Sequence, residues 1–367
     1  MRVALVVPGD VDTTSGGFRY DRRLVASLRE TDEVTVHSVP WRRYPLGVAD
    51  APAAPLSRFA RDADVVVVDE LAHPTFAVGC EGGRAERETP VVALVHHLRC
   101  DEGGPEAPLA RALERRFLAR VDAALCTSSA TERAVSGLSP APLPTLVAPP
   151  TADQFDPDVS PTAVDARASE TPFRVVFLGA VVPRKRPLAL VDALAALSLD
   201  GESGTEWEAT FVGPQPDERY VARVRRRCRR RGVADRVTLT GALPTEDLER
   251  VLRRGHALAL PSRHEGFGIA ALEGMGFGLV PVVTSSGGAT DLVTHGETGF
   301  LVPPEGVGAV AAALSALATD RDRLARVGRA ALGRYRAHPP WEATAARVRA
   351  FLARLVGASS PPTPEAT

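Results

Sequence analysis

The sequence predicts an α/β protein built from two doubly wound, Rossmann-like domains. Short apolar runs rich in β-branched residues alternate with helical patterns, and this alternation is typical of βαβ units and parallel sheets. The alternation stops in a proline-rich stretch over Pro140–Pro161 and then restarts. The length of 367 residues also suits two domains.

The first half of the chain contains five strand-like runs. Arg2–Val7 is predicted to be a buried parallel strand because it is apolar and β-branched. A loop of small polar residues follows and ends at Gly17. The other expected strands are Val34–Val39, Asp64–Val68, Val91–Val95 and Ala123–Thr127. The expected helices are Tyr20–Arg29 and Leu109–Val121.

The second half repeats this architecture without an alignable sequence repeat. Its expected strands are Phe173–Leu178, Glu208–Val212, Val237–Thr240, Ala257–Leu260 and Val280–Thr284, with a helix over Leu188–Leu199. Asp320–Val356 is helical and interrupted at His338-Pro339-Pro340. We therefore expect a first domain over 1–150 and a second over 151–335. A terminal helix over 336–356 is expected to cross back to the first domain, and 357–367 to be a disordered tail.

Composition excludes several classes of protein. A net charge of −1 argues against nucleic-acid binding, and no apolar run has the length of a membrane span. The first segment is too short for a secretory signal. The four cysteines have no metal-site or disulfide spacing. We expect a cytoplasmic protein with reduced thiols and at most a peripheral contact with the inner face of the membrane.

The segment Pro261–Glu273 carries the strongest local signal. A strand runs into a turn that opens a helix, and Gly266 and Gly268 leave the first backbone N–H groups uncovered. Those groups and the helix dipole can bind an anion such as a diphosphate.

Glu265 and Glu273 lie eight residues apart. A continuous helix would separate them by about 12 Å, which exceeds the ~5–9.5 Å of a glycosidase carboxylate pair. The spacing instead suits one elongated ligand held at two polar ends, such as a nucleotide sugar. The alternative is a turn residue followed by a solvated helix position.

Lysine usage points to a second position. Of the 44 Lys and Arg residues, only Lys185 is a lysine. Such a bias follows genome composition, but a retained lysine can mark a site that needs a compact ammonium rather than a planar guanidinium. A surface residue spared by chance is the alternative.

The stretch PSRHEGFGIAALEGMGFGLVPVVTSSGGATDLVTHGETGFLVPP (Pro261–Pro304) resembles the retaining GT-B glycosyltransferases of family 4. It matches the family's E-x7-E element, the following strand, the Gly-Gly loop and the closing G-x-x-G-F-L-V. Weaker similarity covers most of the chain, including the Trp341 region. The resemblance implies two Rossmann-like domains that face a central cleft.

The resemblance also implies roles for residues of the second domain. Glu265 is expected to hydrogen-bond the donor sugar, and Glu273 to bind the nucleotide ribose. Gly266, Phe267 and Gly268 would lie against the sugar and the diphosphate. Lys185, in LGAVVPRKRP, matches the family's diphosphate-binding lysine.

In the first domain, the resemblance concerns Ser15-Gly16-Gly17 and His96-His97. Gly16 and Gly17 match a loop near the donor phosphates, where glycine permits close backbone approach. A simple turn is the alternative. His96 is the better match for a histidine that reaches the sugar, and His97 is the second choice. Acceptor contacts are expected among His97 and the acidic residues that follow strands, namely Asp69, Glu70, Asp101 and Glu102.

The chain departs from the family pattern at three places. Ala180 occupies the position of an arginine, so Arg184 or Arg186 is expected to supply the second positive charge. Asp291 stands where a glutamate is usual. Gly274 and Gly276 replace common alanines, and each costs about 1 kcal/mol of helix propensity, which suggests that close packing requires them.

Taken with the resemblance, these residues predict a metal-independent retaining hexosyltransferase. Lys185, a nearby arginine and helix-terminal amides would neutralise the diphosphate leaving group, with no cofactor and no metal. The donor would be a UDP- or GDP-hexose, and the acceptor a sugar, a lipid or a small molecule. Two alternatives are a GT-B sugar-nucleotide epimerase and a non-catalytic nucleotide-sugar-binding protein.

Overall fold

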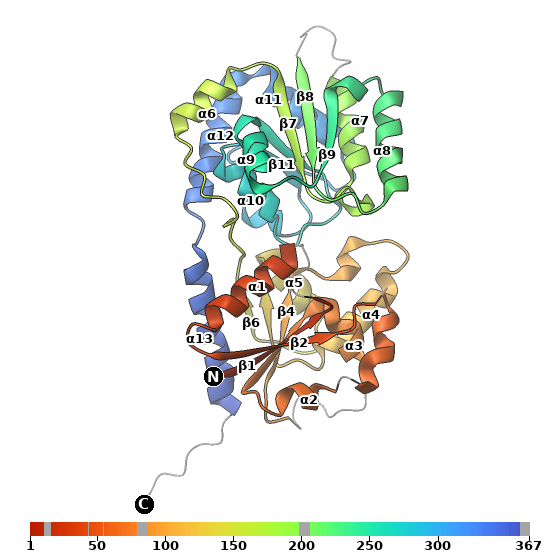
Figure 1. Cartoon of the computed structure of the whole chain (residues 1–367), viewed down its shortest axis with the longest axis vertical. Coiled ribbons are helices and arrows are strands. Elements are labelled where there is room, and N and C mark those ends of the chain that lie inside the picture. Colours follow the sequence, from red (N-terminus) through yellow and green to blue (C-terminus); the bar gives the residue numbers. More distant parts are fainter. Residues whose placement is uncertain (11–15, 43, 54, 79–86, 198–205, 360–367) are drawn as a thin grey trace, which may run out of the picture. The chain divides into compact units, whose positions relative to one another are not determined.

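The computed structural model describes residues 1–10, 16–42, 44–53, 55–78, 87–197 and 206–359. The chain divides into two compact units, each with one six-stranded parallel sheet (Figure 1). The first unit combines Met1–Pro150 with the segment from Pro339 onward, and the second unit is Thr151–His338. The expected α/β fold of two doubly wound domains is therefore confirmed.

The sheet of the first unit has the order β2-β1-β3-β4-β5-β6. Its strands are β1 (Arg2–Pro8), β2 (Glu33–Val39), β3 (Val65–Asp69), β4 (Val91–Val95), β5 (Ala123–Cys126) and β6 (Thr145–Val147). The chain winds outward in opposite directions from β1 and β3, so the switch point lies between these two strands. Open α/β sheets bind ligands beyond the carboxyl ends of the strands at such a point.

The helices of the first unit cover both faces of this sheet. They are α1 (Gly16–Leu28), α2 (Leu56–Ala60), α3 (His73–Ala77), α4 (Ala107–Leu118), α5 (Ser129–Leu138) and α13 (Trp341–Ser359), with 3-10 turns at Leu46–Ala53, Glu70–Ala72 and Arg99–Glu102. One face packs against α1 and α13, and the other face has a separate core.

Helix α13 lies beside α1 (Figure 1). The Trp341 ring meets the edge of Tyr20 at 5.1 Å, and its Nε1 donates to Ser27 Oγ at 2.6 Å. Val348 and Leu352 are fully buried in the same core. Burying such a side chain contributes about 1.5–3 kcal/mol, so α13 is an integral part of the first unit.

The sheet of the second unit has the order β12-β11-β10-β7-β8-β9, with its switch point between β7 and β10. Its strands are β7 (Phe173–Leu178), β8 (Trp207–Val212), β9 (Val237–Gly241), β10 (Ala257–Leu260), β11 (Val280–Thr284) and β12 (Phe300–Val302). Its helices are α6 (Pro161–Ala168), α7 (Pro187–Leu197), α8 (Glu218–Arg230), α9 (Thr245–Arg254), α10 (Ile269–Gly276), α11 (Val307–Thr319) and α12 (Arg321–Arg336).

Several local predictions need correction. The irregular connection predicted over Pro140–Pro161 contains the edge strand β6, whose three residues are too few for a visible period. Helix α1 begins at Gly16, four residues before the predicted start at Tyr20. The prediction was late because glycine and aromatic residues in the first turn obscure the helical pattern. Cys100, Cys126 and Cys228 carry free thiols, and Cys80 lies outside the described residues. No helix in the described ranges combines the length and apolarity that a bilayer crossing requires.

Candidate active site

Lys185 and Glu265 meet at the switch point of the second unit. Lys185 ends a 3-10 turn (Pro183–Lys185) that follows β7, and Glu265 lies in the loop that follows β10. The two residues are 80 positions apart in sequence, yet Lys185 Nζ donates to Glu265 Oε1 at 2.6 Å. Ser262 Oγ donates to the same oxygen at 2.5 Å. The fold thus brings together the two residues that the sequence singled out most strongly.

The Lys185–Glu265 pair is largely withdrawn from solvent, with side-chain exposures of 14% and 9%. Burial alone would raise the pKa of Glu265. The ammonium of Lys185, the hydroxyl of Ser262 and the charge of Arg184 outweigh burial and hold that pKa below its ordinary value. The carboxylate is therefore ionised at neutral pH, and a cation and an anion lie side by side where a ligand is expected.

The Gly-Gly loop after β11 holds the backbone of Glu265 through two hydrogen bonds. The N–H of Glu265 donates to the Ser286 carbonyl at 3.1 Å, and its own carbonyl accepts from the Gly288 N–H at 2.7 Å. Gly287 lies between them with φ +99°, and a Cβ there would come within 1.9 Å of the Glu265 oxygen. Only glycine permits this approach, so the loop fixes the position from which the Glu265 side chain projects.

The segment between Glu265 and Glu273 is a loop followed by a short helix. Gly268, with φ +95°, precedes α10, which begins only at Ile269. The separation of about 12 Å assumed a continuous helix, and this condition is not met. Glu273 is only 5% exposed, so its interpretation as a solvated helix position is wrong. Phe267 is buried, with its ring 5.6 Å from that of His338.

The arginines that flank Lys185 differ in their surroundings. Arg186 donates to Glu305 Oε2 at 2.9 Å and is held in a left-handed backbone conformation. Arg184 is exposed, and its charge acts on Glu265. These contacts favour Arg184 as the second positive charge, in place of the arginine that Ala180 replaces.

The other departures from the family pattern have structural settings of their own. Asp291 ends a 3-10 turn (Gly288–Asp291), and its carbonyl accepts from Arg334 at 2.9 Å. A Cβ on Gly274 would come within 2.8 Å of Leu258, and one on Gly276 within 3.0 Å of Tyr335. A Cβ at either position would lie closer than an ordinary van der Waals contact, which supports the expectation that close packing requires these two glycines.

His96 lies at the carboxyl end of β4 in the first unit and is enclosed by the first turns of α1. A Cβ on Gly17 would come within 3.2 Å of His96 Cδ2. The ring of Tyr20 meets the imidazole edge-on at 5.4 Å. Asp21 Oδ1 is 3.1 Å from His96 Nε2. Gly16 is exposed at the start of α1, and Ser15 lies outside the described residues.

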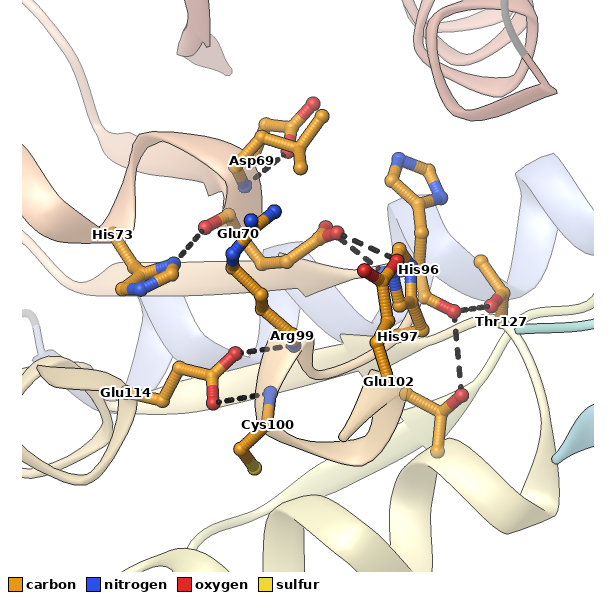
Figure 2. A network of polar contacts seen from close by, with 12 residues as sticks. Asp69, Glu70, His73, His96, His97, Arg99, Cys100, Glu102, Glu114 and Thr127 are labelled. Carbon is orange, nitrogen blue, oxygen red and sulfur yellow. Dashed lines mark hydrogen bonds and ion pairs between the residues drawn. The ribbon is translucent and has the colours of Figure 1, made fainter. Parts of the chain in front are cut away.

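The candidate acceptor residues form a polar network beside His96 (Figure 2). The buried Glu70 accepts from the His96 backbone N–H through Oε2 at 3.0 Å. His97 lies between two carboxylates, with Nε2 2.9 Å from Glu102 and Nδ1 3.8 Å from Glu70. Asp101 is exposed in the 3-10 turn that follows. The structure thus groups His96, His97 and Glu70, whereas Asp101 contributes no side-chain contact to this group.

Asp21 was missed by the sequence analysis, and Asp69 was considered only as an acceptor contact. In the described part of the chain, side-chain atoms of Asp21, Asp69 and His96 lie within 4.8 Å of one another. No spacing in the sequence predicts a metal-type cluster here, because its members come from three distant segments. The available signal was that Asp21 lies four residues after Gly17, on the same face of α1.

Two family models match the chain. One describes the glycosyl transferases of group 1 and matches residues 162–334; the other describes a glycosyl transferase 4-like domain and matches residues 1–151. Together they cover most of both units but not helix α13.

Curated relatives show the same similarity. A GDP-mannose-dependent alpha-(1-6)-phosphatidylinositol monomannoside mannosyltransferase of Mycobacterium tuberculosis is 33% identical over 259 residues, which cover 67% of this chain and 65% of the relative. A D-inositol 3-phosphate glycosyltransferase of Nocardia farcinica is 29% identical over 281 residues, which cover 71% and 61%. The matched regions thus span slightly less than two thirds of these relatives.

Solved structures share the fold over nearly the whole chain. Sucrose-phosphate synthase from Thermosynechococcus elongatus has a TM-score of 0.80 at 20% identity, covering 97% of this chain and 99% of that one. Anabaena HepE in complex with UDP and glucose has a TM-score of 0.74 at 18% identity, covering 96% and 100%. At these identities the likeness concerns the fold alone.

Proposed function

The chain belongs to the glycosyl transferases of group 1, and on that premise we propose that it transfers a hexose from a nucleotide-diphosphate sugar to a hydroxyl acceptor with retention at the anomeric carbon. The observation that carries the proposal is the Lys185–Glu265 pair at the β7/β10 switch point. An ammonium and a carboxylate side by side suit a ligand that is anionic at one part and rich in hydroxyl groups at the next.

In the proposed reaction, Lys185 stabilises the charge that develops on the diphosphate as the bond between the anomeric carbon and the phosphate oxygen breaks. The acceptor oxygen forms its bond to the same face of that carbon, and its proton leaves with the diphosphate. Glu265, kept ionised and fixed by the Gly-Gly loop, accepts hydrogen bonds from the sugar hydroxyls. Both groups are preorganised, so little reorientation accompanies the reaction.

The mechanism assigns no step to a metal or a resident cofactor. The proposal also keeps Arg184 and the Gly266–Gly268 amides as diphosphate contacts, and Glu273 as the ribose contact. In the first unit, it keeps Gly16, Gly17 and His96 on the donor side, and Glu70, His97 and Asp101 on the acceptor side.

The relatives suggest which donors and acceptors to test first. The Mycobacterium tuberculosis relative is named for GDP-mannose and a phosphatidylinositol mannoside, and the Nocardia farcinica relative for inositol 3-phosphate. We therefore propose GDP-mannose or a UDP-hexose as donor, and an inositol-containing molecule as acceptor.

A thermal-shift screen of nucleotide sugars followed by a transfer assay tests the proposed function. A donor at 100 times its Kd should stabilise the protein by about 2.7 kcal/mol. The best donor is then incubated with phosphatidylinositol and inositol phosphates, and the product linkage is read by NMR. Donor turnover without acceptor would indicate an epimerase, stabilisation without turnover a binding protein, and an inverted linkage would contradict retention.

Replacement of Glu273 should affect donor binding more than turnover. The Glu273→Gln side chain keeps its size at a buried position but loses the charge, and hydrogen bonds to a charged group contribute about 1.5–3 kcal/mol. We expect the donor KM to rise about 10–100-fold with kcat within a few-fold of wild type. Steady-state kinetics with varied donor measures both, and a drop in kcat at constant KM would contradict the ribose role.

A further inference from the structure

Two buried carboxyl groups stand next to the imidazole of His96. Asp21 and Asp69 are both fully buried. Asp21 directs Oδ1 to His96 Nε2 at 3.1 Å, and Asp69 Oδ1 accepts from the Leu71 N–H at 2.7 Å. The second oxygen of each carboxyl, Oδ2, is buried and has no hydrogen-bond partner among the described residues. Glu70 Oε1, on the residue that follows Asp69, is also buried without a hydrogen-bond partner among the described residues. Burying such oxygens unsatisfied is costly, and a proton held between neighbouring carboxyl groups would remove part of that cost.

Electrostatics supports a single proton on the carboxyl pair. Burial raises the pKa of Asp21 to about 7, and burial together with the negative charge of Asp21 raises the pKa of Asp69. Two neighbouring carboxylates in a dry site do not both ionise, since each disfavours the charge of the other. A proton held in a hydrogen bond between the Asp21 and Asp69 side chains satisfies this pair and leaves one negative charge on it.

The remaining charge faces His96, whose ring is held on its other sides. Burial lowers the pKa of His96, which favours a neutral imidazole. Gly17 and Tyr20 pack against the ring, and Glu70 Oε2 holds the backbone N–H at 3.0 Å. Figure 2 shows Asp69, Glu70 and His96 in this network. A neutral imidazole beside a carboxylate oxygen places its hydrogen on the nitrogen that faces that oxygen.

We propose that Asp21 and Asp69 share one proton and together act as the positioning pair of His96, fixing the tautomer that carries hydrogen on Nε2. Nδ1 is then left as a hydrogen-bond acceptor. We expect His96 Nδ1 to accept a hydrogen bond from a substrate hydroxyl, a consequence that rests on the proposed function. The titratable and charged groups that face the pair are Tyr20, Arg22, Glu70 and His96, and His97 lies behind Glu70 at 3.8 Å.

The shared proton makes stability depend on pH with a defined sign. The folded protein keeps a proton that an unfolded aspartate loses near pH 4, so wild-type stability falls as pH rises from about 4 to about 7 and is level above. In the Asp21→Asn variant, the side-chain amide donates a permanent hydrogen bond to Asp69 and its oxygen still accepts from His96. The stability of this variant should therefore not fall over the same pH range. The Tm of the variant minus that of wild type should grow by roughly 3–5 °C per pH unit between pH 5 and 7.

Asp32 provides a matched control in the same unit. Its pKa is lowered to about 2 by Arg349 and the N-terminal amine, although burial opposes this. Asp32→Asn should therefore lower Tm by an amount that does not change between pH 5 and 7. If the Asp21→Asn difference is equally flat, the carboxyl pair does not hold a shared proton and the proposal fails.

Long-range ¹H–¹⁵N NMR of protein with ¹⁵N-labelled histidine measures the tautomer directly. The His96 signals are identified by their absence from the spectrum of His96→Gln. We expect a protonated Nε2 and an unprotonated Nδ1 in wild type and Asp21→Asn, and a mixture in Asp21→Ala. A proton on Nδ1 in wild type at pH 7 would overturn the proposal. So would a Tm increase on adding Mn²⁺ or Zn²⁺ that Asp21→Asn abolishes, since a cation would then occupy the cluster.

Kinetics separates this proposal from the proposed function. Asp21→Ala should lower kcat about 10-fold with donor KM little changed, and Asp21→Asn should recover most of that loss. If wild-type protein turns over no nucleotide sugar, the proposed function fails while the Tm and NMR measurements still decide the positioning pair.

Discussion

We expect replacement of Lys185 with methionine to lower kcat about 10²–10³-fold. Losses of this size are usual when one preorganised group that stabilises charge at the reacting centre is removed. Methionine keeps an unbranched apolar side chain, one heavy atom shorter than that of lysine, but removes the ammonium that contacts Glu265 at 2.6 Å. The measurement is kcat for donor hydrolysis or transfer, together with thermal unfolding. A Lys185→Met protein with wild-type kcat would contradict the assignment of this ammonium to the leaving group.

Two further variants separate catalysis from stability in this experiment. Removing only Lys185 leaves the buried Glu265 carboxylate unpaired, which can cost about 3–5 kcal/mol. Lys185→Met combined with Glu265→Gln removes both charges and should recover most of the Tm but none of the turnover. Arg186→Met deletes the cation that follows this turn and is paired with Glu305, and it should keep kcat within a few-fold of wild type.

Gly287→Ala should produce the largest loss of stability in the second unit. Its φ of +99° disfavours any side chain, and the new Cβ would lie 1.9 Å from the Glu265 carbonyl oxygen, far inside contact distance. The Gly-Gly loop would have to move away and break its hydrogen bonds to Glu265. We expect a destabilisation of about 3–5 kcal/mol, which lowers Tm by roughly 10 °C, with kcat reduced further because Glu265 is displaced.

The matched control is Gly308→Ala in helix α11. A Cβ at that position meets no atom within 4 Å, and alanine is the better helix former. Its Tm should be unchanged or slightly higher. The Tm values of both variants are measured by thermal unfolding. Equal values would show that the Gly-Gly loop tolerates a side chain and that its two hydrogen bonds do not fix Glu265.

The fold was largely predictable because parallel strands buried on both faces are continuous apolar runs. Val65–Asp69 and Val91–Val95 illustrate this, since every residue in each is buried. Short edge elements were not predictable in the same way. β6 and β12 have three residues each, too few to show a period, and their position depends on the strand beside them.

The residues of the candidate site also differ in how far the sequence predicted them. Lys185 and Glu265 stood out through composition and local motif, and the sheet order brings them together. Asp21 did not stand out, because a single aspartate in a polar helix resembles a solvated residue, and only the packing of α1 against the end of β4 buries it beside His96. Burial of a polar side chain by a distant segment has no signature in a single sequence.

The return of α13 to the first unit has a consequence for how the protein is made. On the ribosome, residues 1–150 emerge long before Trp341, Val348 and Leu352, which complete their core. The nascent first unit therefore exposes an apolar groove along α1 while the second unit, a continuous segment, is already able to fold. We therefore expect the first unit to complete its core only after α13 has been synthesised.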